Sequence, residues 1–169
     1  MVTIRKFTEA DIADKVRWIN DPEVNRFLHY DLPLEEEKTK LWFRKICEKK
    51  ERFDGVIESD GVPCGLIGLL DIDEKNRKAE LYLTLGETSY KRRGVSYQAV
   101  VLMLDYAFAE LGLNKVYLYT ETANIPAQRL FEKVGFHRDG LLRADLYYRE
   151  HWVDRYAYAI LNNEFDTEE

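Results

Sequence analysis

Residues 121–136 read ETANIPAQRLFEKVGF, and the organisation of the chain can be worked out from this stretch. Pro126 suits the first turn of a helix, because the N–H that proline lacks would be unpaired there anyway. Apolar residues follow at helical spacing as far as Val134, and Gly135 is typical of a helix C-terminus. The stretch predicts a short amphipathic helix, and alternating residues in Lys115–Thr120 predict a strand before it.

A basic turn lies further upstream, between a predicted strand at Ala79–Leu85 and a predicted long helix at Val95–Leu111. The turn, Tyr90–Gly94, reads YKRRG. A helix N-terminus offers unpaired N–H groups and partial positive charge, and glycine lets a bulky ligand approach the backbone closely. These features suit a pyrophosphate, whereas the alternative is a solvated basic turn before an ordinary surface helix.

The rest of the chain predicts a single domain, 1–169, because no linker, repeat or low-complexity segment interrupts it. Further strands are predicted at Val2–Phe7, Asp54–Ser59, Pro63–Ile72, Leu141–Tyr148 and Trp152–Leu161, and helices are predicted to start at Thr8 and near Pro33, the second ending near Lys50. Asp60-Gly61 favours a type I′ hairpin turn. The order of elements predicts a mixed α/β sheet with helices on both faces.

Composition excludes several classes of protein. Of the 169 residues, 46% are hydrophobic and 13% aromatic, which is too rich in apolar side chains for a disordered chain. The longest apolar run, Ala99–Leu104, is too short to span a membrane. A net charge of −6 argues against nucleic acid as the main partner. Two cysteines and no secretory signal predict a reduced, cytoplasmic protein, and the scattered histidines indicate no metal site.

The two motif-bearing segments resemble those of one known family. Residues 124–136 match N-x-x-A-x-x-L-[YF]-E-K-x-G-F, a signature seen in the GNAT superfamily of acyl-CoA-dependent N-acyltransferases. Lys91–Ser96 resembles that family's [QR]-x-x-G-x-[GA] pyrophosphate loop. Asp21–Val24 and Trp152–Asp154 are similar to the ribosomal-protein-alanine and diamine (spermidine) N-acetyltransferase branch. The resemblance implies the GNAT fold, whose central sheet splays between its fourth and fifth strands.

The resemblance also implies acetyl-CoA as co-substrate, bound where the strands Ala79–Leu85 and Lys115–Thr120 splay apart. Backbone groups of Leu83, Thr84 and Leu85 would pair with the pantetheine arm, and one N–H would face the thioester oxygen. Asn124 would cap the short helix or bond the pantetheine amide. The residues expected to hold the cofactor are Leu83, Thr84, Leu85, Lys91, Arg92, Arg93, Gly94, Val95, Ser96, Asn124 and Phe131.

Three residues depart from the family pattern. Lys91 replaces the usual Gln or Arg and keeps a positive charge, and Ser96 replaces Gly or Ala and stays small. Phe131 occupies the place where many members carry a tyrosine thought to protonate the departing thiolate. Phenylalanine has no proton to give, so the thiolate must leave unassisted or another hydroxyl must serve.

Glu80 is the candidate general base, because an aliphatic ammonium must lose a proton before its nitrogen can attack a thioester. Strand alternation places Glu80 on the face opposite Leu81 and on the same face as Tyr82. The alternative is an exposed glutamate paired with a lysine. Tyr82 and Trp42 are candidate substrate-binding residues, although packing is the default interpretation of both. Glu35 is a further candidate for binding a cationic acceptor, although its position near a helix N-terminus also suits the helix dipole.

The resulting hypothesis is an enzyme that transfers the acetyl group of acetyl-CoA to a primary amine by direct attack in a ternary complex. The acceptor is a small amine, such as a polyamine or amino sugar, or a protein N-terminus. The alternative is a non-catalytic acyl-CoA-binding sensor or interaction module. Edge strands near the C-terminus could pair two subunits into a homodimer.

Overall fold

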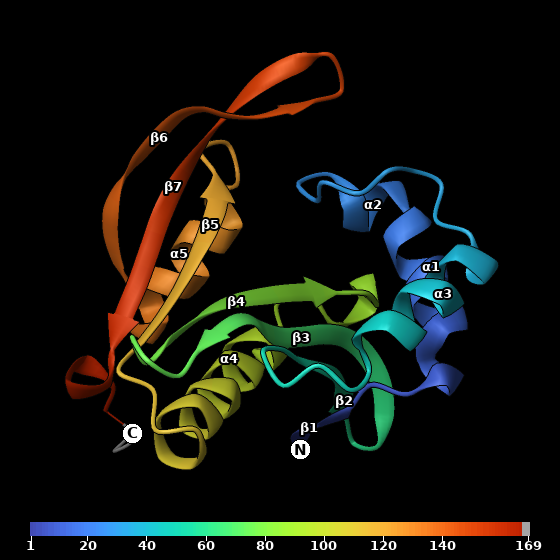
Figure 1. Cartoon of the computed structure of the whole chain (residues 1–169). Coiled ribbons are helices and arrows are strands. Elements are labelled where there is room, and N and C mark those ends of the chain that lie inside the picture. The colour runs from blue at the N-terminus through green and yellow to red at the C-terminus, as the bar shows by residue number, and fades with distance from the viewer. Residues whose placement is uncertain (167–169) are drawn as a thin grey trace.

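The structure is a computed structural model that describes residues 1–166. A seven-stranded sheet with the order β1-β2-β3-β4-β5-β7-β6 runs through the molecule (Figure 1). The strands are β1 (Val2–Lys6), β2 (Phe53–Ser59), β3 (Val62–Asp73), β4 (Lys78–Leu85), β5 (Lys115–Glu121), β6 (His137–Tyr148) and β7 (His151–Leu161). The helices are α1 (Ile12–Asn20), α2 (Pro22–Asn25), α3 (Glu36–Ile46), α4 (Val95–Asp105) and α5 (Ile125–Val134). The predicted mixed α/β sheet is confirmed.

The first four strands lie side by side in chain order, each antiparallel to the next, and we call them the meander. The turn between β2 and β3 contains Asp60 at φ 50° and Gly61 at φ 80°. Positive φ at both central residues is what a type I′ turn requires. The predicted hairpin is therefore confirmed, and its turn sets which β2 and β3 residues face each other.

Helices cover both faces of the sheet, which confirms that part of the prediction. On one face, α1 and α3 pack with Phe7, Val56 and Leu66 in a small apolar cluster. On the other face, α4 packs against a larger core that includes Ile67 and Leu81, which are at most 3% exposed. Each face of the meander is therefore buried, so its inner strands are rigidly held.

Two helix predictions needed correction. The helix predicted from Pro33 to Lys50 is the shorter α3, because Leu34 is held outside it by two hydrogen bonds with Asn20 (2.7 and 3.0 Å). The predicted helix at Val95–Leu111 is α up to Asp105 and continues as a π-helix to Glu110. Helix α2 was not predicted, although Asp21 caps it by accepting from the Glu23 N–H at 2.9 Å.

The last two strands form a longer hairpin than the sequence predicts. Strand β6 begins at His137 rather than at Leu141, since the backbone of 137–140 pairs with Ala157–Ala159 of β7. Arg149 and Glu150 both have positive φ and make the tight turn. The hairpin rises beyond the rest of the sheet (Figure 1).

A core substitution tests this packing. Ile67 lies on β3 and is fully buried against α4, so Ile67→Ala should lower the free energy of unfolding by about 2–5 kcal/mol. Val62 begins the same strand and is 50% exposed, so Val62→Ala should change it by about 0.5 kcal/mol or less. Urea denaturation followed by circular dichroism measures both. Equal losses in the two variants would contradict the packing described.

Candidate active site

The sheet opens between β4 and β5. These two strands are parallel, and their pairing extends only from Lys78 opposite Lys115 to Glu80 opposite Tyr117. Beyond that point β5 continues to pair with β7, and β4 continues to pair with β3 (Figure 1). The splay predicted between the fourth and fifth strands is confirmed, and it leaves one edge of β4 without a strand partner.

Backbone groups along this edge of β4 point into the opening. The N–H of Gly86 donates to the carbonyl of Cys64 on β3 at 2.8 Å. Successive residues of a strand send their backbone groups to opposite sides, so Leu83 and Leu85 present theirs to the opening while Thr84 faces β3. An extended ligand arm laid along this edge would find hydrogen-bond donors and acceptors at strand spacing.

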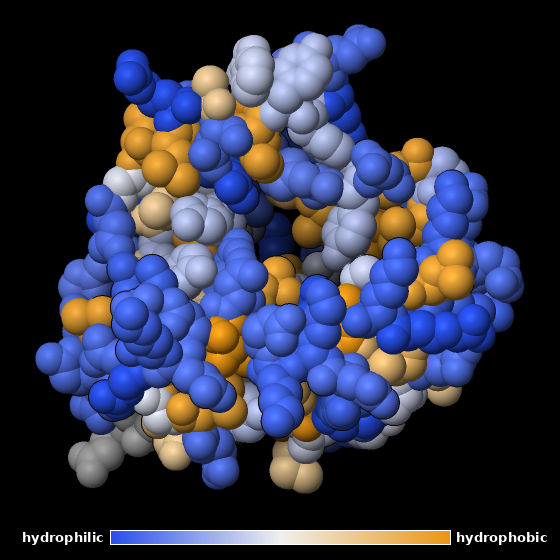
Figure 2. All heavy atoms as spheres, in the orientation of Figure 1, coloured by the Kyte–Doolittle hydropathy of each residue, from blue (hydrophilic) through white to orange (hydrophobic). Residues whose placement is uncertain are grey.

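A cavity of about 410 Å³ fills the opening. Its walls are Glu80–Leu85 of β4, Leu118–Glu121 of β5, and Phe27–Tyr30 of the segment that follows α2. The space-filling view shows a hollow in the middle of this face (Figure 2). We call this cavity the acceptor pocket, and its volume suits a small molecule.

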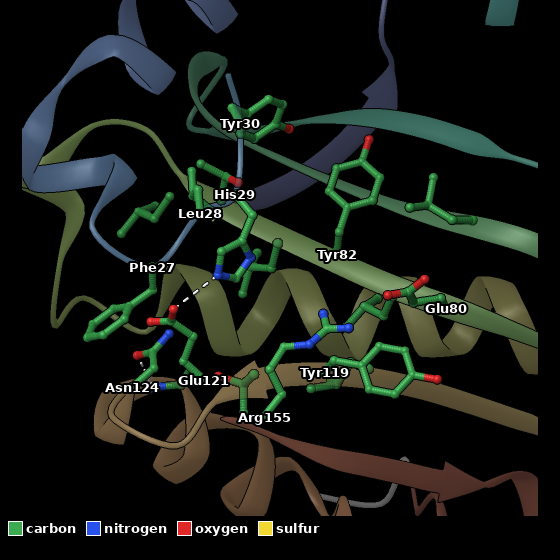
Figure 3. A pocket seen from close by; sticks show the side chains of 18 of the residues that line it. Phe27, Leu28, His29, Tyr30, Glu80, Tyr82, Tyr119, Glu121, Asn124 and Arg155 are labelled. Carbon is green, nitrogen blue, oxygen red and sulfur yellow. Dashed lines mark hydrogen bonds and ion pairs between the residues drawn. The ribbon is translucent and has the colours of Figure 1, made fainter. Parts of the chain in front are cut away.

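Glu80 points into the acceptor pocket (Figure 3). Burial raises the pKa of its carboxyl group above the usual range, and the negative charge of Asp71 raises it further, while Arg155 opposes the shift. A carboxylate whose pKa is raised toward neutrality is a better proton acceptor than an exposed one. The environment of Glu80 therefore suits a general base.

Other polar groups line the β5 side of the pocket. His29 Nε2 lies 3.1 Å from Glu121 Oε1. Arg155, from β7, is held by Asp145 at 2.6 Å, and its guanidinium lies 4.6 Å from the centre of the Tyr119 ring. Figure 3 shows the Arg155 and His29 side chains reaching into the pocket. Arg155 and Glu121 are not predicted as site residues from the sequence, because the contacts that bring them here join residues far apart in the chain.

The hydroxyl of Thr120, in the β5 wall of the pocket, is a buried polar group without a hydrogen bond to the described residues. Thr120 is 6% exposed and lines the pocket, and its Oγ1 is buried with no hydrogen-bond partner among the residues described. Buried polar groups are nearly always paired, so this oxygen marks a place where a bound ligand would supply the missing hydrogen bond.

A second cavity, of about 770 Å³, joins the acceptor pocket, and we call it the basic groove. Leu85, Asn124 and Ala127 line both cavities, so the two adjoin each other at these residues. The groove runs between the α4 N-terminus and α5. Its cations are Arg26, Lys91, Arg92, Arg129 and Lys133.

The predicted pyrophosphate turn lies in this groove. Gly94 is the N-cap of α4 and has φ 75°, a conformation that favours glycine. Lys91, Arg92, Val95 and Ser96 line the groove with it, and Arg93 does not. The Arg93 guanidinium instead lies 5.4 Å from the centre of the Tyr90 ring. Free N–H groups, a helix dipole and several cations therefore meet in one groove, as anion binding requires.

The two remaining cofactor candidates lie at the junction of the cavities. Asn124 caps α5, since its Oδ1 accepts from the Ala127 N–H at 3.3 Å. Phe131 is 7% exposed, lines the acceptor pocket and packs edge-on against Phe136 at 5.4 Å between ring centres. Phe131 therefore borders the pocket and is also part of the core.

Of the three substrate-binding candidates, two line the acceptor pocket and one does not. Trp42 and Tyr82 line the acceptor pocket, and the Tyr82 hydroxyl donates to Asp54 Oδ1 at 2.5 Å. Glu35 lies outside it as the N-cap of α3, where its carboxylate pairs with Lys38 at 3.3 Å.

Within residues 1–166, no group of three or more His, Cys, Asp or Glu side chains is arranged to hold a metal ion. In the same residues no helix is long and apolar enough to cross a membrane.

Known proteins resemble this chain over most of its length. The chain is 27% identical to spermidine N(1)-acetyltransferase of Escherichia coli (strain K12), over 99% of this chain and 89% of that protein. It is 32% identical to the putative ribosomal N-acetyltransferase YdaF of Bacillus subtilis (strain 168), over 64% of this chain and 59% of that protein. Both relatives are N-acetyltransferases by name.

Solved structures share the fold. Spermidine N-acetyltransferase from Vibrio cholerae, solved in complex with CoA and spermine, superposes with a TM-score of 0.89 over 96% of each chain at 22% identity. The Acetyltransferase (GNAT) domain family matches residues 1–137, which include the splayed strands, the basic turn and α5. The chain therefore belongs to the GNAT family of acetyltransferases.

Proposed function

We propose that this protein transfers the acetyl group of acetyl-CoA to a primary amine by direct attack in a ternary complex. The observation that carries the proposal is the junction of the acceptor pocket and the basic groove beside the free edge of β4. The Escherichia coli relative is named a spermidine N(1)-acetyltransferase, and the Vibrio cholerae protein of the same fold was solved with CoA and spermine. These facts support an acyl-CoA donor and an amine acceptor.

The co-substrate would supply an activated acetyl group and the chain would position it. Lys91, Arg92 and the α4 N-terminus would bind the pyrophosphate. The backbone of Leu83 and Leu85 would hold the pantetheine arm, and one of these N–H groups would donate to the oxygen that becomes negatively charged during acyl transfer. The chain would thereby bring the carbonyl carbon to the mouth of the acceptor pocket.

Glu80 would take the proton of the amine, directly or through a water molecule. Removal of that proton frees the nitrogen lone pair, which attacks the carbonyl carbon to form a C–N bond as the C–S bond breaks. The electron pair of the C–S bond leaves on sulfur. A thiolate of this kind has a conjugate acid of pKa about 8.5, by analogy with cysteine, so it can leave without the acid that Phe131 cannot supply.

Assay of thiol release tests the proposal. With acetyl-CoA, we expect release that depends on an added amine, in a panel of polyamines, amino sugars, amino acids and peptides with free N-termini. The volume of the acceptor pocket, about 410 Å³, favours the small amines over the peptides. Mass spectrometry of the product should show one acetyl group on nitrogen. Absence of turnover across the panel would contradict the proposal.

The second candidate is a non-catalytic acyl-CoA-binding module. Phe131 favours it, because this residue lines the pocket and carries no acid group. In that case acetyl-CoA should bind in calorimetry while no amine in the panel is acetylated. Turnover that disappears on replacement of Glu80 would eliminate this candidate.

A further inference from the structure

The acceptor pocket has a cationic end. Lys15 of α1, Tyr30, Trp42 of α3, and Arg52 and Asp54 at the start of β2 all line it there, and we call this set the Lys15 end. Tyr82 joins this end to the rest of β4, since it bonds Asp54 and lies on the same face of the strand as Glu80. The pocket thus runs from the candidate base toward a group of basic side chains.

The close contacts of the Lys15 ammonium are aromatic rings. Lys15 is 8% exposed, and within residues 1–166 its Nζ makes no hydrogen bond or ion pair. It lies 3.5 Å from the centre of the Trp42 ring, 5.8 Å from that of Tyr30 and 5.9 Å from that of Phe7. Burial lowers its pKa to about 8, so it is still charged at pH 7. Asp54 favours the charged form of Lys15 and Arg52 opposes it, so no carboxylate is left to Lys15 alone. A buried cation in these surroundings is costly unless a further anion joins it.

The carboxylate whose charge favours protonated Lys15, that of Asp54, is already occupied. Asp54 accepts from Arg52 Nε at 2.7 Å and from a terminal nitrogen of Arg52 at 2.8 Å. It also accepts from the Tyr82 hydroxyl at 2.5 Å. Arg52 and Asp54 therefore neutralise each other, and Lys15 leaves this end of the pocket with one positive charge in excess.

Further donors surround that charge. The Tyr30 hydroxyl makes no hydrogen bond within the described residues, and burial raises its pKa, so it keeps its proton. Figure 3 shows Tyr30 and Tyr82 together on one wall of the pocket. Arg52 has N–H groups that Asp54 does not use, because a guanidinium has five. An ammonium, a hydroxyl and a guanidinium together match the lone pairs of a carboxylate.

We propose that the Lys15 end binds a carboxylate of the acceptor, so that the preferred acceptor is an amino carboxylate whose amine faces Glu80. This inference rests on the proposed function, and it narrows the class of amine. The Lys15 side chain would donate to the carboxylate from its place above Trp42, and Tyr30 and Arg52 would orient it. Trp42 would then act on the substrate by holding Lys15.

The same geometry disfavours an acceptor with two ammonium groups. An extended diamine with one nitrogen at Glu80 would bring its second ammonium toward Lys15, and like charges at a desolvated site repel. The rings of Phe7, Tyr30 and Trp42 could bind a ligand ammonium through cation–π contacts, but Lys15 already occupies them. Lys15 would therefore compete with a ligand ammonium for these rings.

Matched acceptors test the inference. The panel is glycine, β-alanine, γ-aminobutyrate and ε-aminocaproate, each with the alkylamine and the diamine of the same chain length. In the wild-type protein, kcat/KM for the best amino carboxylate should exceed that of its alkylamine and diamine by about tenfold or more. Lys15→Met should lower kcat/KM for the amino carboxylate by about tenfold. The kcat/KM for the alkylamine should stay within about threefold of the wild-type value. Lys45→Met, on the exposed side of α3, is the matched control and should change neither.

Two further measurements check that the variants are folded and still bind acetyl-CoA. Circular dichroism should show Lys15→Met folded, since methionine keeps the packed stem and removes a buried charge. Calorimetry should show the same acetyl-CoA affinity in both lysine variants. Wild-type protein that prefers the diamines, or a Lys15→Met variant that slows all acceptors equally, would overturn the inference while leaving the acetyltransferase proposal intact.

Binding without turnover separates the two proposals. Calorimetry with butyrate, which has no amine, measures the Lys15 end alone in protein saturated with CoA. Butyrate binding that Lys15→Met weakens about tenfold, with no amine acetylated, would leave the carboxylate site standing and refute the proposed function. Amine turnover without Lys15-dependent butyrate binding would support the proposed function and refute the carboxylate site.

Discussion

Glu80→Gln should lower kcat by about a hundredfold or more at pH 7, because general-base catalysis typically contributes 10²–10⁴-fold. Glutamine keeps the size of the side chain and its place on β4, but it cannot accept a proton. The acetyl-CoA affinity should stay close to the wild-type value, since Glu80 lines the acceptor pocket and not the basic groove. Steady-state kinetics and calorimetry measure the two quantities separately.

The pH profile of this variant carries the sharper test. Burial, and then Asp71, raise the pKa of Glu80, so the basic form of the wild-type site is present above that raised value and is lost as pH falls through it. The wild-type rate should therefore rise through the pKa of Glu80. The variant should lack this step and gain activity only toward pH about 10, where an aliphatic amine deprotonates by itself.

A neighbouring carboxylate provides the control for this profile. Asp71 is exposed and adds to the raised pKa of Glu80 through its charge. Asp71→Asn should shift the acidic limb of the wild-type profile to lower pH and leave the maximal rate unchanged. Wild-type rates in Glu80→Gln across the whole pH range would show that Glu80 is not the base.

Charge reversal in the basic groove should raise the KM for acetyl-CoA. Lys91→Glu combined with Arg92→Glu removes two cations beside the α4 N-terminus and adds two negative charges. Hydrogen bonds to charged groups contribute about 1.5–3 kcal/mol each, so the double variant should raise KM by about a hundredfold or more. Turnover at saturating acetyl-CoA should be nearly unchanged, because neither residue lines the acceptor pocket.

The adjacent arginine distinguishes a local contact from a general effect of charge. Arg93 lies outside the groove, against Tyr90, so Arg93→Glu should raise KM far less than the double variant. Added salt should narrow the difference, because ions screen exposed charges. A double variant with the wild-type KM would contradict the pyrophosphate assignment.

Local sequence signals predicted much of the fold. The pair Asp60-Gly61 predicted a turn, and both residues have the positive φ that such a turn needs. Gly94 and Gly135 were predicted to mark helix boundaries, and both are end caps in the left-handed conformation. Such signals are reliable because the conformation depends on one or two residues and their neighbours. The start of α3 was less predictable, since Asn20 holds Leu34 across a long stretch of chain.

In the candidate site, too, local patterns predict some residues and long-range contacts place the others. Periodicity placed Glu80 and Tyr82 on one face of a strand, and the structure puts both in the acceptor pocket. No local pattern indicated the contact of His29 with Glu121 or the Arg155 that reaches in from β7. Arg155 reaches the pocket because β7 pairs with β5, which forms one wall of it, and His29 meets Glu121 because the segment after α2 lies against the same pocket.

The amino-acid sequence alone specifies a mixed sheet, a basic turn before a helix and a carboxylate on the fourth strand. Its apolar periodicity and its glycines carry this information. These features follow from backbone sterics and from alternation along a strand, which act over a few residues. The width of the opening, the raised pKa of Glu80 and the unpaired charge of Lys15 arise only on packing. Each depends on how much water distant elements exclude, which no short stretch of sequence controls.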